Sequence, residues 1–153
     1  PSTSPDPRGR NTLIRNIDYG IQPTTQNRRV LDIFTELQHR LKFSDHGNAI
    51  AVLLRVLLEL SIDQYIFQQS VSNIHTNDKL ANKFRKCADH MLSSGKLDNK
   101  YHQILKKFEQ AEPLISANTL HGYIHSKDFF PSDTHLKSIW DTLETYVLIC
   151  VKS

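Results

Sequence analysis

The sequence of Gly47–Gln69 is GNAIAVLLRVLLELSIDQYIFQQ, and it contains the largest block of apolar residues in the chain. As a helix, this stretch is apolar on nearly every side, whereas a helix on a protein surface keeps one polar face. Its apolar residues are Ile50, Val52, Leu53, Leu54, Val56, Leu57, Leu58, Leu60, Ile62, Tyr65, Ile66 and Phe67. The stretch therefore predicts a buried central helix around which an all-α domain is organised.

Three charged residues, Arg55, Glu59 and Asp63, stand near the middle of this stretch. About 20 residues could reach across a bilayer, but each charge at the centre of a membrane-spanning helix costs roughly 3 kcal/mol. The sequence shows neither a signal peptide nor a lipidation motif. We therefore expect no membrane partner.

Arg55 and Glu59 are spaced i, i+4, so they lie on one face of the predicted central helix. Charges in a protein core are normally paired, and the simplest interpretation is a buried polar pair whose members neutralise each other beside a neighbouring helix end. The alternative is that the two side chains line a polar seam or pocket inside the bundle. The sequence leaves both interpretations open.

Helical spacing of apolar residues extends over most of the remaining chain. It predicts helices over residues 27–41, 77–93, 98–111, 114–125 and 132–153. Asn27, Asp98 and Ser132 are expected at helix N-caps, and Gly95 is expected in the left-handed conformation after a helix end. Phe129, Phe130 and Pro131 predict an aromatic loop that closes the core. These elements predict a single bundle of five to six helices over residues 27–153.

Residues 1–26 predict a linker followed by an extended segment. Three of the six prolines lie within the first seven residues, and few apolar side chains accompany them. Leu13, Ile14 and Ile17 form a short apolar group that we expect to dock on the core. With no initiating Met, this opening is typical of an interdomain linker, and we expect the domain to be the C-terminal part of a longer protein.

The 153 residues include two cysteines, Cys87 and Cys150, which lie far apart on the apolar stripes of two predicted helices. Buried free thiols are therefore favoured over a disulfide, and free thiols are typical of a reducing compartment. We accordingly expect a cytoplasmic location.

The net charge of +3 conceals a basic stretch over residues 79–107, where eight Lys or Arg accompany two Asp. Clustered basic residues are a common footprint of nucleic-acid binding. Two helix faces exposed to solvent would give the same composition, so this alternative stays open. The candidate nucleic-acid-binding residues are Lys79, Lys83, Arg85, Lys86, Lys100, Lys106 and Lys107.

The densest group of polar functional side chains lies in SANTLHGYIHSKD, which contains Asn118, His121, Tyr123 and His125. Asn118, His121 and His125 fall on one face of a helix. Two histidines at i, i+4 are a zinc-binding spacing, but no Cys or carboxylate stands where a third ligand usually follows, so we predict no metal site. Acid and base catalysis by the histidine pair is the chemical alternative, and a structural role is a third.

The same region, about residues 114–146, resembles the HEPN superfamily of bacterial helical bundles. The resemblance rests on the late Asn118 and His121, on the run HGY, and on the last helix that contains Trp140. Many members are toxin or antiviral ribonucleases with the signature Arg, four to six residues, then His. Here Ser116 or Leu120 stands where that arginine belongs, and Arg40 with His46, or Arg85 with His90, reproduces only the spacing.

The leading interpretation is a non-catalytic helical module, similar to degenerate HEPN domains, within a larger intracellular bacterial protein, for example of a defence system. It would mediate oligomerisation, as a homodimer, or bind other domains of the same polypeptide, with no cofactor. One alternative is a metal-independent ribonuclease with His121, His125 and Asn118 as catalytic residues. The other is a nucleic-acid-binding domain that uses the basic stretch.

Overall fold

The computed structural model describes residues 10–127, 129 and 132–153, and in these residues the regular structure is helical, so the predicted all-α class is confirmed. The elements in order are α1 (Arg28–Thr35), the π-helical turn η2 (Glu36–Arg40), α2 (Phe43–Gln69), α3 (Leu80–Ser93), α4 (Asn99–Ala111), α5 (Pro113–Ser116), α6 (Leu120–Ile124) and α7 (Asp133–Val151).

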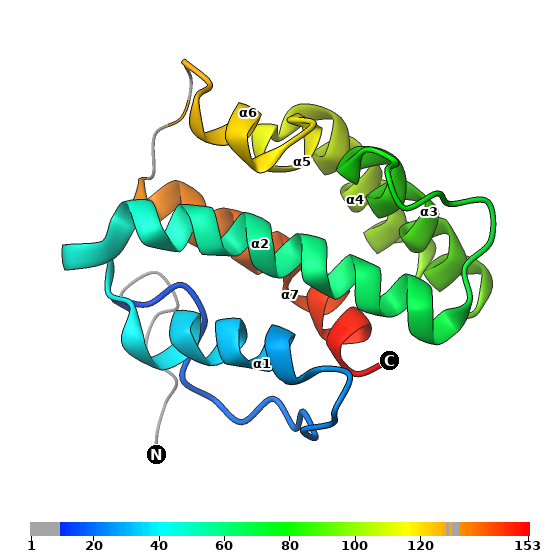
Figure 1. Cartoon of the computed structure of the whole chain (residues 1–153), viewed down its shortest axis with the longest axis horizontal. Coiled ribbons are helices and arrows are strands. Elements are labelled where there is room, and N and C mark those ends of the chain that lie inside the picture. Colours follow the sequence, from blue (N-terminus) through cyan, green and yellow to red (C-terminus); the bar gives the residue numbers. More distant parts are fainter. Residues whose placement is uncertain (1–9, 128, 130–131) are drawn as a thin grey trace.

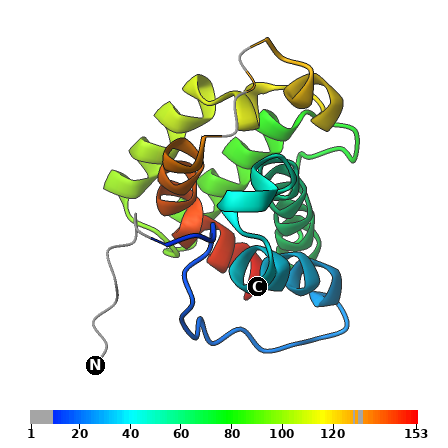
Figure 2. The ribbon, with the colours of Figure 1, turned by 90° about the vertical axis from the view of Figure 1, so that its left-hand side faces the viewer.

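Helix α2 occupies the centre of the bundle. Figure 1 shows it lengthwise across the molecule, with α1 on one side and α5 and α6 on the other, while α7 runs behind it. It packs against α1, η2, α3, α6 and α7, and α3 packs against α4. The view turned by 90° separates the α3–α4 pair from the α1 side of the bundle (Figure 2). The prediction of a central helix is therefore confirmed.

The backbone of α2 is kinked at His46, where φ is −133° and ψ is 31°, so the regular helix begins at about Gly47 as expected. Its inward residues are Ile50, Ala51, Leu54, Arg55, Leu57, Leu58, Ser61, Ile62, Gln64 and Tyr65. The expectation that this helix is buried on every side is wrong along one face, because the Phe67 side chain is 77% exposed and Leu53, Val56 and Leu60 are only partly buried.

The helix predicted over residues 114–125 is instead two short helices, α5 and α6. Ala117, between them, has extended backbone angles. The Thr119 side chain then caps α6 by accepting a hydrogen bond from the Gly122 backbone N–H at 2.9 Å. The bundle therefore has seven α-helices in its described residues rather than five or six.

The N-terminal segment docks on the bundle in part. Leu13 and Ile14 are fully buried, as predicted, whereas Ile17 is 42% exposed. The Arg15 guanidinium forms an ion pair with Glu144 of α7 at 2.9 Å, and the Tyr19 hydroxyl donates to the same carboxylate at 2.6 Å. The segment predicted as a linker is thus attached to α7 from residue 10 onward; residues 1–9 lie outside the described residues.

Several predicted helix ends are confirmed. The Asp98 side chain accepts from the Tyr101 N–H at 2.8 Å and the Ser132 hydroxyl accepts from the His135 N–H at 3.4 Å. Gly95 has a φ of +77° after α3. Asn27, in contrast, makes no cap bond to α1; its side-chain oxygen accepts from the Thr24 N–H instead.

Both cysteines are buried and free, as expected. Burial raises the pKa of the Cys87 thiol to about 12. Of the predicted aromatic loop, Phe130 and Pro131 lie outside the described residues. The Phe129 ring packs edge-on against Tyr123 of α6, with ring centroids 5.2 Å apart.

Candidate functional site

Arg55 connects the central helix to the break between α5 and α6. Its Nε donates to the Glu59 carboxylate at 2.6 Å, and its Nη1 donates to the backbone carbonyls of Leu114 and Ala117, each at 2.9 Å. The Arg55 side chain is only 1% exposed, whereas that of Glu59 is 40% exposed. The predicted ion pair therefore exists, but only its arginine is buried.

Helix α5 explains why those two carbonyls need a donor. It has four residues, so most of its backbone carbonyl groups have no partner within the helix. A buried carbonyl without a donor costs about 1–3 kcal/mol, and the guanidinium supplies donors for the carbonyl of Leu114 in α5 and for that of Ala117, its C-cap residue. Arg55 therefore acts as a C-terminal cap for α5, delivered from a residue almost 60 positions earlier.

A polar pocket of about 360 Å³ lies beside Arg55. It is lined by Arg55, Glu59, Asp63, Thr76, Asp78, Leu80, Lys83, Asn118, Thr119 and Leu120. Both interpretations of the Arg55–Glu59 pair are thus met together, since the pair is satisfied and it also borders a pocket. Asn118 joins this pocket, while His121 and His125 are not among the residues that line it.

The charges around this pocket are paired with one another. Lys83 contacts the Asp63 carboxylate at 3.1 Å, and Arg55 contacts Glu59. A hydrogen bond from the His75 backbone N–H lowers the pKa of Asp78 below its usual value. These contacts favour a polar seam that holds α2, α3 and the α5–α6 turn together.

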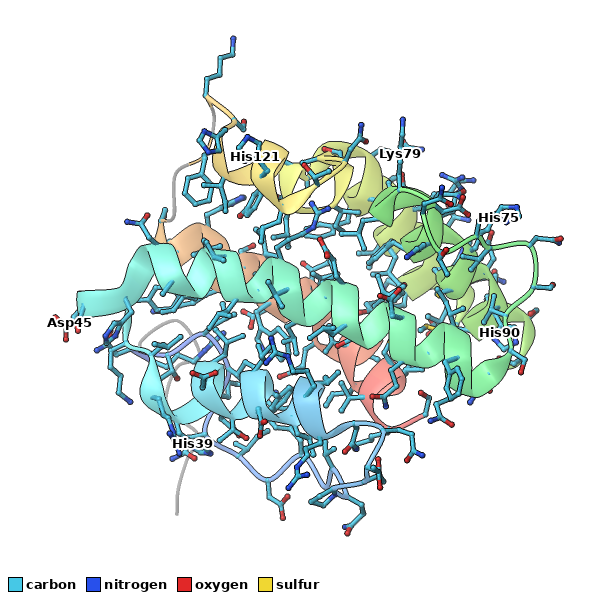
Figure 3. All side chains as sticks on the ribbon, in the orientation of Figure 1. His39, Asp45, His75, Lys79, His90 and His121 are labelled. Carbon is cyan, nitrogen blue, oxygen red and sulfur yellow. The ribbon has the colours of Figure 1, made fainter. Side chains whose placement is uncertain are left out.

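His121 and His125 lie together on the outer side of α6, and Figure 3 places the labelled His121 at the edge of the molecule. Their rings stack with centroids 4.2 Å apart and an interplanar angle of 28°. Both side chains are exposed. The histidine pair and Asn118 therefore face different surroundings, although the sequence pattern placed all three on one helix face.

The arginine positions of the HEPN signature are also informative. Ser116 ends α5 and Leu120 begins α6, so neither supplies a cation. Arg55 reaches the same turn from α2, but its guanidinium is buried against backbone carbonyls. His90 is hydrogen-bonded to the Tyr65 hydroxyl at 2.6 Å, away from Arg85, which is 3.7 Å from Glu109. Among the described residues, no hydrogen bond or ion pair joins Arg40 to His46 or Arg85 to His90.

The basic stretch is divided between intramolecular partners and solvent. Lys83 is paired with Asp63, Arg85 with Glu109, and the Lys86 ammonium donates to the Asn73 carbonyl. The remaining candidates, Lys79, Lys100, Lys106 and Lys107, are exposed on the loop before α3 and on α4. Three of the seven candidate residues therefore serve contacts within the domain.

A second polar cluster, between α3 and α4, was not anticipated from the sequence. The His102 Nε2 lies 2.7 Å from the Asp89 carboxylate, and since a carboxylate only accepts, Nε2 carries the hydrogen. The His102 Nδ1 and the Glu109 Oε1 are buried and have no hydrogen-bond partner among the described residues. Both side chains line a pocket of about 70 Å³. The available signal was an aspartate and a histidine on two neighbouring predicted helices.

Other site types are limited by what the described residues contain. Over residues 10–127, 129 and 132–153, no group of three or more His, Cys, Asp or Glu side chains is arranged to hold a metal ion. No helix within those ranges is long and apolar enough for a membrane crossing.

Comparisons of this chain with protein-family models, with curated proteins and with solved structures found no match.

Proposed function

We propose that this chain is a helical interaction module that forms a homodimer through the outward face of α2. The observation that carries the proposal is an apolar stripe of Leu53, Val56, Leu60 and Phe67, here called the α2 stripe. Together with Asp63, these residues occupy the spacing 3, 4, 3, 4 of a helix-pairing seam. Phe67 is 77% exposed, and the other three apolar residues are only partly buried.

In Figure 1, α2 runs across the front of the molecule between α1 and the α5–α6 region, with α7 behind it. A second copy of the chain suits the α2 stripe because the spacing is nearly symmetric about Leu60. A two-fold axis close to Leu60 would place Phe67 of each copy near the Leu53–Val56 end of the other. The interface would then cover two Phe67 side chains, one in each of its halves.

The charges beside the stripe are compatible with self-association. Glu59 is paired with Arg55 at 2.6 Å, and Asp63 is paired with Lys83 at 3.1 Å. Each carboxylate is therefore neutralised within its own copy, so that a two-fold axis brings together little uncompensated negative charge. Full burial of one phenylalanine contributes about 1.5–3 kcal/mol, and two copies would supply a large share of the ~8 kcal/mol that a micromolar Kd requires.

The test is sedimentation-velocity ultracentrifugation of the wild type and two variants. The wild type is expected at twice the 17.6 kDa chain mass, whereas Phe67→Asp should be monomeric at the same concentration. Ile104→Asp is the matched control, because Ile104 is 45% exposed but lies on α4, away from the stripe. A monomeric wild type at 200 μM, or equal loss of the dimer in both variants, would refute the proposal.

A further inference from the structure

The histidine pair of α6 is not used by the proposed dimer face. His121 lies in α6 and His125 directly follows it, and the His125 N–H donates to the His121 carbonyl at 3.0 Å. The two rings stack 4.2 Å apart. Neither ring has a hydrogen bond or an ion pair in the part of the chain that the structure describes. Their nitrogens are therefore available to a ligand.

The sequence predicted no metal site because a third protein ligand is missing; contrary to that prediction, we propose that His121 and His125 alone bind one divalent metal ion of the Zn²⁺ class through a ring nitrogen of each imidazole. Imidazole nitrogen is a preferred ligand of zinc, nickel and copper ions, and Zn–N bonds are about 2.0–2.1 Å long. Two nitrogens on one zinc ion therefore lie at most about 4.2 Å apart, and closer in a tetrahedral site. Because the His125 N–H donates to the His121 carbonyl, the two residues lie one helical turn apart on the same face, and rotation of both rings out of their stack can direct one nitrogen of each toward a single ion.

The turn that carries the pair is anchored by its own contacts. Thr119 caps α6 through the Gly122 N–H at 2.9 Å. Tyr123, which stands between the two histidines in the sequence, is buried. Since the backbone of the turn is already fixed, little conformational entropy is lost when both imidazoles bind one ion. Both histidines are exposed, so the ion has direct access from solvent.

Two protein ligands leave the other positions of the ion to water or to a donor on another molecule. This coordination distinguishes the pair from a structural zinc site, which has four protein ligands and stabilises the fold outright. We expect an exchangeable ion with a Kd between about 1 and 100 μM, weaker than that of structural sites. Metal binding at this pair is independent of the α2 stripe, and it should persist in monomeric Phe67→Asp.

The test is a Zn²⁺ titration at pH 7.5 in competition with a chromophoric chelator, using protein without a histidine tag. The wild type is expected to bind one equivalent, and His121→Ala and His125→Ala should each weaken binding at least tenfold. His75→Ala is the matched control and should stay within twofold, because His75 is exposed elsewhere, on the loop before α3. Cys87 and Cys150 are buried and do not compete for the ion.

Imidazole ¹⁵N chemical shifts give a second readout that does not depend on affinity. Addition of Zn²⁺ should move the ring nitrogen signals of His121 and His125 and leave that of His75 in place. Binding that survives both alanine substitutions, or no saturable binding below 1 mM Zn²⁺, would overturn the proposal. Circular dichroism of each variant should match the wild type, since both side chains are exposed.

Discussion

Replacement of Arg55 by methionine should destabilise the domain far more than any change to its ion-pair partner. The variant removes two charge-assisted hydrogen bonds to the carbonyls of Leu114 and Ala117, each worth about 1.5–3 kcal/mol. Methionine fills most of the vacated volume, so the cavity contribution stays small. We therefore expect the free energy of unfolding to fall by about 3–5 kcal/mol, as for other buried ion pairs that lose one partner.

The matched variant Glu59→Gln keeps the shape of the side chain and removes only its charge. Because the Glu59 side chain is 40% exposed, water compensates the loss, and we expect a cost of about 0.5–1 kcal/mol. In the double variant Arg55→Met/Glu59→Gln the cost should be close to that of Arg55→Met alone. Once Arg55 is replaced, residue 59 has no buried cation to contact, so its own replacement adds little and the two changes are not additive.

Urea unfolding followed by circular dichroism at 222 nm measures all three changes. An unchanged dependence of the free energy on urea concentration would show that the native state, rather than the compactness of the unfolded chain, is affected. The reasoning fails if Arg55→Met costs less than 1 kcal/mol, or if Glu59→Gln costs as much as Arg55→Met. The first result would mean that the capping of α5 contributes little, and the second that the ion pair is the main contribution of Arg55.

Two further changes test the core. Leu57→Asp places a charge at a fully buried position of α2 and should abolish the cooperative thermal transition, whereas Phe67→Asp should keep it; a wild-type melt for Leu57→Asp would contradict the burial of α2. Burial raises the pKa of Tyr101 and Tyr123 to about 12, so the folded state holds protons that the unfolded chain releases near pH 10, and stability should fall as pH rises from about 10 to 12. Tyrosinate absorbance at 295 nm should accordingly appear together with the loss of helix, and ionisation near pH 10 in an intact helical protein would refute this expectation.

The central helix was predictable because its signal is local. A run of apolar residues that leaves no polar face on a helix has to be surrounded by other elements, and this holds for any arrangement of the neighbours. The same run did not reveal that Phe67 points outward. Exposure of one residue depends on where the flanking helices end, and that information is tertiary.

The break between α5 and α6 shows the opposite case. Apolar spacing over residues 114–125 fits one helix, and nothing in that window opposes it. The break is stabilised by a donor from α2, since the Arg55 guanidinium takes the carbonyls that a continuous helix would have used internally. Only Thr119, a residue favoured at N-caps, gave a local signal that a new helix begins at Leu120.

The candidate sites show the same difference between signals that are local in the sequence and signals that arise only from tertiary packing. Arg55 and Glu59 were identified because charges inside an apolar stretch are rare, and their pairing followed from their spacing. Asp89 and His102 were missed because each is ordinary on its own helix, and their 2.7 Å contact exists only once α3 packs against α4. A pattern along one helix reports which side chains share a face. It does not report what the facing helix presents.

Arg55 finally explains why the histidines and Asn118 separate, although the pattern placed them on one face. By capping α5 at Ala117, it turns the chain before α6 begins, so that Asn118 remains beside the polar pocket. The new helix then starts from the Thr119 cap with a different direction, and His121 and His125 face solvent. Arg55 itself is committed to the backbone, since its guanidinium donates to the carbonyls of Leu114 and Ala117 and so builds the turn between α5 and α6.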